Sequence, residues 1–202
     1  MVRSLILATS ILGSLIATGA KADIIQTFDL TWSGAPLGNQ ASATGTITID
    51  ETLLPNPSSG EEFLPFPDSA FLNLSITVTG SPAGDGTFGT SDYAYVAWDT
   101  GGVALDLNQD LVGQSTSDAP WGTLAAAQSQ GSSGDFNLED LGTDNLAPSA
   151  SGWFELTTPG GSHMLLTSFA PEAAPVPEPA SSTLIGLGLG GLAFLRRRRK
   201  AA

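Results

Sequence analysis

The central part of this sequence contains no lysine or arginine. All seven Lys and Arg residues lie within residues 1–21 and 196–200, whereas all 20 Asp and Glu residues lie between Asp23 and Glu178. The region between the two basic ends therefore has a formal side-chain charge of −20, which the net charge of −13 for the whole chain conceals. Because Lys and Arg salt bridges are impossible there, each carboxylate must be solvated, hydrogen-bonded to backbone N–H groups or bound to a cation.

This charge distribution limits both partners and stability. Nucleic acid is excluded as a partner, since phosphate binding needs Lys and Arg. Self-repulsion should destabilise the compact state, so we expect salt or millimolar Ca²⁺ to raise the melting temperature. The chain has no cysteine, so disulfides cannot stabilise an exported domain. Residues 23–170 are long enough to form one domain that buries roughly 70% of its unfolded surface.

Apolar and polar residues alternate through this central region, at the period of two that is typical of half-buried β-strands. The clearest run is Phe71 to Thr79, in which Leu72, Leu74, Ile76 and Val78 share one face. Further strands are predicted at 28–32, 46–50, 103–108, 153–158 and 164–169, and an apolar central strand at 92–98.

Turn residues separate these runs, and helix signals are almost absent, apart from one turn predicted at 124–128. We therefore predict an all-β domain at 23–170 with about seven to nine short strands. The expected fold is a single antiparallel β-sandwich, with jelly-roll-like connections as one form and a closed barrel as the alternative. Long loops are expected at 53–67 and 128–134.

The N-terminal residues read as a signal peptide at 1–22. Arg3 provides the positive charge, residues 5–16 are mostly apolar, and Ala20-Lys21-Ala22 has the small-x-small pattern of a cleavage site. We expect cleavage after Ala22, with Ala20 as the alternative.

The other end reads as a membrane segment. A Pro-rich linker at 171–179 precedes an apolar span at 180–195 and a basic stop formed by Arg196, Arg197, Arg198, Arg199 and Lys200. As a helix the span would be roughly 24 Å long, which is shorter than a hydrocarbon core of about 30 Å, so arginine snorkelling and local thinning would be needed. Basic residues stay on the cytoplasmic side, which places the β domain outside the inner membrane.

Val176, Pro177, Glu178 and Pro179, followed by the Gly- and Leu-rich span and the arginine cluster, resemble the PEP-CTERM sorting signal of Gram-negative bacteria. The resemblance covers residues 176–200. It implies export and handling by exosortase, a membrane transpeptidase-like enzyme, in bacteria that commonly produce exopolysaccharide. It indicates a sorting route and assigns no activity to the β domain.

Two tryptophans are candidates for binding sugar. Trp121 lies in the turn Pro120-Trp121-Gly122, and Trp153 shares the polar face of its predicted strand with Glu155 and Thr157. An exposed indole beside carboxylates and hydroxyls suits stacking on a sugar ring. The alternative is that each indole packs on a neighbouring loop.

Metal and catalytic signals are weak. Asp106-x-Asn108-x-Asp110 has the opening spacing of a Ca²⁺ loop, but Leu111 and Ser117 replace the required Gly and Glu. A looser surface Ca²⁺ site stays open, with Asp85, Asp92, Asp99 and Asp106 nearest the predicted turns.

No pair among the acids stands out for glycoside hydrolysis. His163 and Ser162 should point to opposite faces of a strand and cannot form a catalytic pair. We therefore expect no enzyme and no cofactor, but an exported structural or interaction protein near exopolysaccharide. A carbohydrate-binding module is the alternative, followed by a hydrolase.

Overall fold

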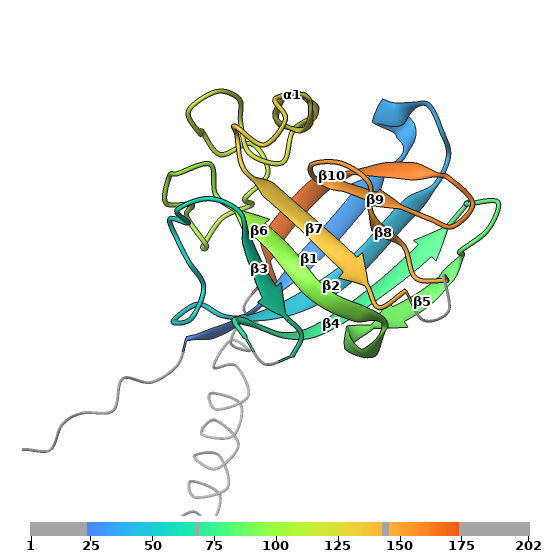
Figure 1. The fold of residues 1–202 in the computed structure, drawn as a ribbon, viewed down its shortest axis with the longest axis horizontal. Coiled ribbons are helices and arrows are strands. Elements are labelled where there is room, and N and C mark those ends of the chain that lie inside the picture. Colours follow the sequence, from blue (N-terminus) through green and yellow to red (C-terminus); the bar gives the residue numbers. More distant parts are fainter. Residues whose placement is uncertain (1–23, 68, 143–145, 174–202) are drawn as a thin grey trace, which may run out of the picture.

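The computed structural model describes residues 24–67, 69–142 and 146–173, which form two antiparallel sheets packed face to face (Figure 1). The large sheet has seven strands in the order β5-β4-β2-β1-β10-β9-β8 and curls like half of a barrel, whereas the small sheet has the order β3-β6-β7. The predicted antiparallel all-β architecture is confirmed. The curl of the large sheet is also a feature of a closed barrel, the alternative fold considered from the sequence.

The large sheet consists of β1 (Ile25–Ser33), β2 (Ser42–Asp50), β4 (Phe71–Thr79), β5 (Gly86–Gly89), β8 (Ser149–Ala150), β9 (Glu155–Thr157) and β10 (His163–Pro171). The small sheet consists of β3 (Glu62–Pro65), β6 (Tyr93–Asp99) and β7 (Asp135–Asp140). Helical structure in the described residues is limited to α1 (Leu124–Gln128), η1 (Ala35–Leu37) and η2 (Thr90–Asp92). The single turn expected at 124–128 is confirmed, and the Thr123 hydroxyl caps it by accepting a hydrogen bond from the Ala126 N–H.

An aromatic cluster joins the two sheets. Trp98 of β6 packs against Phe71 of β4 at 6.0 Å, Phe169 of β10 at 6.3 Å, Phe136 of β7 at 6.4 Å and Trp121 at 5.6 Å between ring centroids. All five side chains are at most 1% exposed. Burial of such large rings supplies most of the stabilisation available to a domain without disulfides. The central strand expected at 92–98 is confirmed as β6, which lies between β3 and β7.

The strand predicted at Phe71 to Thr79 is confirmed as β4, with one difference in its buried face. Leu74, Ile76 and Val78 point into the core as expected, but Phe71 is buried there and Leu72 is only partly buried. The pairing of β4 with β2 shifts between Thr48 and Ile49, so the strand has an extra residue at this point. A bulge of this kind reverses the side-chain alternation, which the sequence pattern alone could not indicate.

One predicted strand and one predicted loop were wrong. Residues 103–108, expected to be a strand, lie outside any sheet, although Leu105 and Leu107 are buried as the alternation suggested. The Asn56 side chain replaces a neighbouring strand there, because it donates to the Leu105 carbonyl and accepts from the Leu105 N–H, each at 2.8 Å. Conversely, β3 forms within the loop expected at 53–67, whereas 128–134 is a loop as expected.

Both ends of the described chain leave the large sheet on the same side. β1 begins where β10 ends, with Phe28 opposite Pro171, and the Glu172 N–H donates to the Thr27 carbonyl at 2.8 Å. The sheet therefore extends into the start of the predicted linker. Among the described residues no helix has the length and apolarity to cross a membrane. The predicted signal peptide at 1–22 and span at 180–200 lie outside them.

Candidate functional site

Backbone N–H groups take the place of the missing cations in this domain. Seven aspartate side chains accept hydrogen bonds from backbone N–H groups at turns and strand ends; they are Asp50, Asp85, Asp92, Asp99, Asp106, Asp110 and Asp135. A carboxylate that accepts such bonds is stabilised by the amide dipoles, without a positively charged partner. The sequence left three possibilities for these carboxylates, namely solvation, hydrogen bonding to the backbone and cation binding. The structure shows hydrogen bonding to the backbone.

Asp135 is the most deeply buried of these aspartates. Its Oδ1 atom accepts from the N–H groups of Phe136 and Phe154, both at 2.8 Å, and its Oδ2 atom accepts from the Asn137 side-chain amide. Burial raises the pKa of Asp135 to about 8, outweighing the two backbone hydrogen bonds that act to lower it. Phe154 has a positive φ of 60°, which is unusual for a phenylalanine, and the bond to Asp135 holds it there. Asp135 therefore fixes the turn before β9 to the start of β7.

Trp121 occupies the space beside this junction and is completely buried, so the expectation of an exposed Trp121 that stacks on sugar is wrong. Its indole N–H donates to the Asp99 carbonyl at 2.8 Å, and its ring meets Phe154 edge to face at 4.9 Å. Trp121 does lie in a turn, as the sequence predicts. The turn itself folds back over the core, because the Trp121 N–H bonds to the Gln114 carbonyl across the loop.

Trp153 lies in the turn before β9 and keeps 36% of its surface exposed. Its indole edge rests on the loop after α1, where a Cβ added to Gly131 would lie 2.7 Å from the indole nitrogen. The strand predicted at 153–158 is shorter than expected, because β9 covers only Glu155–Thr157, but Phe154 and Leu156 are both buried as predicted. The side chain thus packs on a neighbouring loop and also leaves a surface open to solvent.

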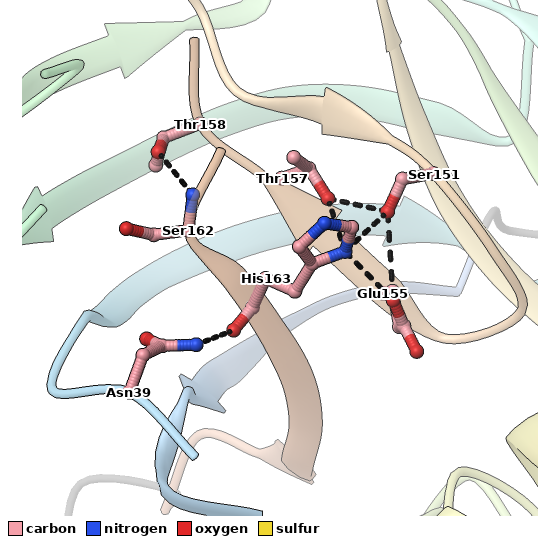
Figure 2. A network of polar contacts seen from close by, with 7 residues as sticks. All are labelled: Asn39, Ser151, Glu155, Thr157, Thr158, Ser162 and His163. Carbon is pink, nitrogen blue, oxygen red and sulfur yellow. Dashed lines mark hydrogen bonds and ion pairs between the residues drawn. The ribbon is translucent and has the colours of Figure 1, made fainter. Parts of the chain in front are cut away.

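A polar cluster surrounds His163, the single histidine, at the start of β10 (Figure 2). The Nδ1 atom of its ring lies 3.1 Å from the Ser151 hydroxyl, 3.1 Å from the Thr157 hydroxyl and 3.2 Å from Glu155 Oε2. The Ser151 and Thr157 hydroxyls also contact each other. We call Ser151, Glu155, Thr157 and His163 the His163 cluster.

The geometry of the His163 cluster differs from that of a serine hydrolase. In a serine-type triad one imidazole nitrogen accepts the proton of the nucleophile, whereas the N–H at the other nitrogen is oriented by the carboxylate. Here Ser151 and Glu155 both contact Nδ1. Ser162 does not take part either, because it is buried on the other face of the strand, where its N–H donates to the Thr158 hydroxyl at 3.2 Å (Figure 2). The expected separation of Ser162 from His163 is confirmed.

Two surface depressions of the described domain lie near residues considered above. One, of about 350 Å³, adjoins the His163 cluster and is lined by Asp140, Ala147, Ser149, Ala150, Ser151, Thr157, Thr158 and Pro159. The other, of about 500 Å³, lies near the start of β6 and is lined by Phe66, Pro67, Thr90, Ser91, Tyr93, Ala94 and Leu141. The first offers mainly hydroxyl and carboxylate groups, the side chains that bind polyhydroxylated ligands.

The loop that resembles a Ca²⁺ site is closed by its own hydrogen bonds. Asp106 Oδ1 accepts from the Asn108 backbone and side chain, and Oδ2 accepts from the Gln109 amide, which holds the pKa of Asp106 below its usual value. Asp110 is turned toward β10, where it accepts from the Phe169 N–H and the Ser168 hydroxyl. Within the part of the chain that the structure describes, no three His, Asp or Glu side chains are grouped to hold a metal ion.

Comparison with known families found one match, to the PEP-CTERM protein-sorting motif at residues 175–200. The match contains the four residues 176–179 and the arginines 196–199 that the sequence pattern had singled out. It implies export and association with the cell envelope. No curated protein and no solved structure matched the chain. The protein is thus one that bears a PEP-CTERM sorting motif.

Proposed function

We propose that this protein is exported across the inner membrane and sorted by an exosortase-type enzyme, and that its β domain then acts as a non-enzymatic interaction module within or near exopolysaccharide. The observation that carries the proposal is the sorting motif at 175–200. Proline at 177 and 179 would present Glu178 in an extended segment, while the apolar span and the arginines would hold the end of the chain in the membrane.

Several features of the described domain favour an interaction role over catalysis. In the His163 cluster Ser151 and Glu155 contact the same imidazole nitrogen, whereas a serine-type triad places the nucleophile and the carboxylate on opposite nitrogens. Seven aspartates are engaged by backbone N–H groups, as is expected of carboxylates that stabilise turns. An acidic surface without lysine or arginine would also stay soluble among anionic polymers and would bind them weakly unless cations bridge the two.

The sorting step can be tested in the cell. Replacing the four residues Arg196 to Arg199 by serine should release the protein from the envelope fraction or misroute it, because the basic stop is lost. Replacing Pro177 and Pro179 by alanine should leave the span in place and block processing, so the full-length form should accumulate in the membrane. Glu172→Gln, which lies outside the motif, is the matched control. Cell fractionation followed by mass spectrometry of the mature C-terminus would be applied to all three variants. Unchanged fractionation of both motif variants would contradict the proposal.

Carbohydrate binding is the second candidate, and Trp153 is the residue that favours it. Its indole is partly exposed, and aromatic faces of this kind stack on sugar rings. The depression beside the His163 cluster supplies hydroxyl groups and Asp140. Binding of the wild-type protein on a glycan array, lost in Trp153→Ala and kept in Leu146→Ala, another exposed apolar residue, would support this function. Absence of binding to acidic and neutral glycans alike would count against it.

A further inference from the structure

Three exposed apolar residues lie at one end of the domain, and two of them follow each other along an extended segment, so their side chains point to opposite faces of the large sheet. Ile24, Ile25 and Leu53 are 53%, 57% and 61% exposed. They are neighbours in space, because Ile25 pairs with Asp50 across β1 and β2, the Glu51 N–H donates to the Ile24 carbonyl at 2.8 Å, and the Leu53 N–H donates to the Asp50 carbonyl at 3.1 Å. We call these three residues the end patch.

The described chain also finishes at this end. β10 runs toward it, Pro171 lies opposite Phe28, and Glu172 is still hydrogen-bonded to Thr27. In the sequence only residues 174–179 separate the last described residue from the apolar span that begins at Ala180. Six extended residues reach at most about 20 Å. The end patch is therefore held within a short distance of the start of the predicted membrane segment.

We propose that the end patch contacts the interfacial layer of the bilayer in which residues 180–195 are anchored, so that the domain stands on the membrane by this end. The opposite end would then face away from the membrane. It consists of the turns at 34–41, 80–85 and 158–162 and the adjoining His163 cluster. This inference rests on the proposed function, since it applies to the chain while its tail is anchored, before the sorting enzyme processes it.

The charges at this end are compatible with contact to a neutral lipid surface. Asp50 is buried and accepts hydrogen bonds from Thr52. Burial raises the pKa of Glu51, and its Oε1 atom is shielded from solvent without a hydrogen-bond partner. Glu172 is exposed and can remain in water. Three apolar side chains are few for a free protein, but a short tether gives them a high effective concentration at the surface.

The absence of cysteine allows a direct test, because a single introduced cysteine is a unique labelling site. The anchored chain would be placed in neutral phosphatidylcholine vesicles with Leu53→Cys carrying an environment-sensitive fluorophore, and spin-labelled lipid would be added as quencher. We expect blue-shifted emission and several-fold stronger quenching than for the same label at Ala83→Cys, an exposed residue in the turn between β4 and β5. Adding Ile24→Ser and Ile25→Ser to Leu53→Cys should reduce that quenching.

Flotation of the vesicles separates this inference from the function on which it rests. If the protein fails to float with the lipid, the anchor itself is wrong. If it floats but the labels at residues 53 and 83 are quenched equally, the end patch does not touch the bilayer and the inference is overturned. The label at residue 53 could also show blue-shifted emission that grows with the number of protein molecules per vesicle and is not quenched by spin-labelled lipid. That result would overturn the inference as well, because a second copy of the protein would then cover the end patch.

Discussion

The Asp135 junction and the His163 cluster show two environments in which the same domain places an acidic side chain. At the junction, Asp135 is buried and held by backbone N–H groups of Phe136 and Phe154. In the cluster, Glu155 lies at the surface beside His163, whose side chain is 48% exposed. The first arrangement fixes two segments of backbone, so it serves the fold. The second joins side chains in solvent, where exposed ion pairs contribute little to stability, so it is free to serve binding.

The largest expected difference between the two regions is in packing. Trp121→Ala should lower the free energy of unfolding by about 3–5 kcal/mol, because it removes a fully buried ring beside the junction. Trp153→Ala, in the turn near the cluster, should cost no more than about 1 kcal/mol, since the indole is partly exposed. Urea unfolding of both variants checks this, and equal losses would show that the contrast is false.

Asp135→Ala tests the buried hydrogen bonds. It leaves the Phe136 and Phe154 N–H groups without their acceptor, so we expect a loss of about 2–3 kcal/mol. Asp135→Asn retains a side-chain oxygen at this position and should lose less. Thermal and urea unfolding would measure both variants. If the two substitutions are equally mild, the junction does not hold the turn before β9 in the way described.

The junction also predicts how stability depends on pH. The raised pKa of Asp135, about 8, means that the folded protein keeps a proton between roughly pH 4 and 8 that the unfolded chain releases. Stability should therefore fall as the pH rises from 5 to 8. Burial raises the pKa of Glu51 and Glu139, which adds an effect of the same sign. In Asp135→Asn this slope should become clearly shallower, and melting curves at several pH values would reveal it.

The smallest effect is expected in the cluster. His163→Ala should change the free energy of unfolding by less than about 0.5 kcal/mol, because its contacts are exposed to solvent. Chemical denaturation of wild type and variant in parallel would measure it. A loss as large as that of Asp135→Ala would make the cluster a structural element and would remove the reason to treat it as a binding surface.

The part of this structure that the sequence could predict is the part governed by local alternation. β4, β6 and α1 were expected at or within a residue or two of their observed positions. β7 was not predicted, because only Phe136 and Leu138 carry its apolar alternation; Asp135 and Asn137, on its polar parity, are nevertheless buried. Their burial depends on the turn before β9, which approaches from a distant part of the chain.

The candidate sites also divide into those that a local sequence pattern could predict and those that depend on contacts between distant residues. The burial of Trp121 results from a long loop that folds back on the core, and no pattern within Pro120-Trp121-Gly122 reports that. The His163 cluster needs β9 paired with β10, which brings Glu155 and Thr157 beside a histidine that follows them by several residues. The sorting motif was recognisable from the sequence because its three features are contiguous.

In this domain backbone N–H groups stabilise aspartate side chains that lysine and arginine would pair with in other domains. The most direct test compares melting temperatures in CaCl₂ and in NaCl at matched ionic strength. Both salts should raise the melting temperature by screening the surplus negative charge, and to a similar extent. Stabilisation by calcium well beyond that of sodium, saturating at low concentration, would mean that bound cations and not backbone amides hold this domain together.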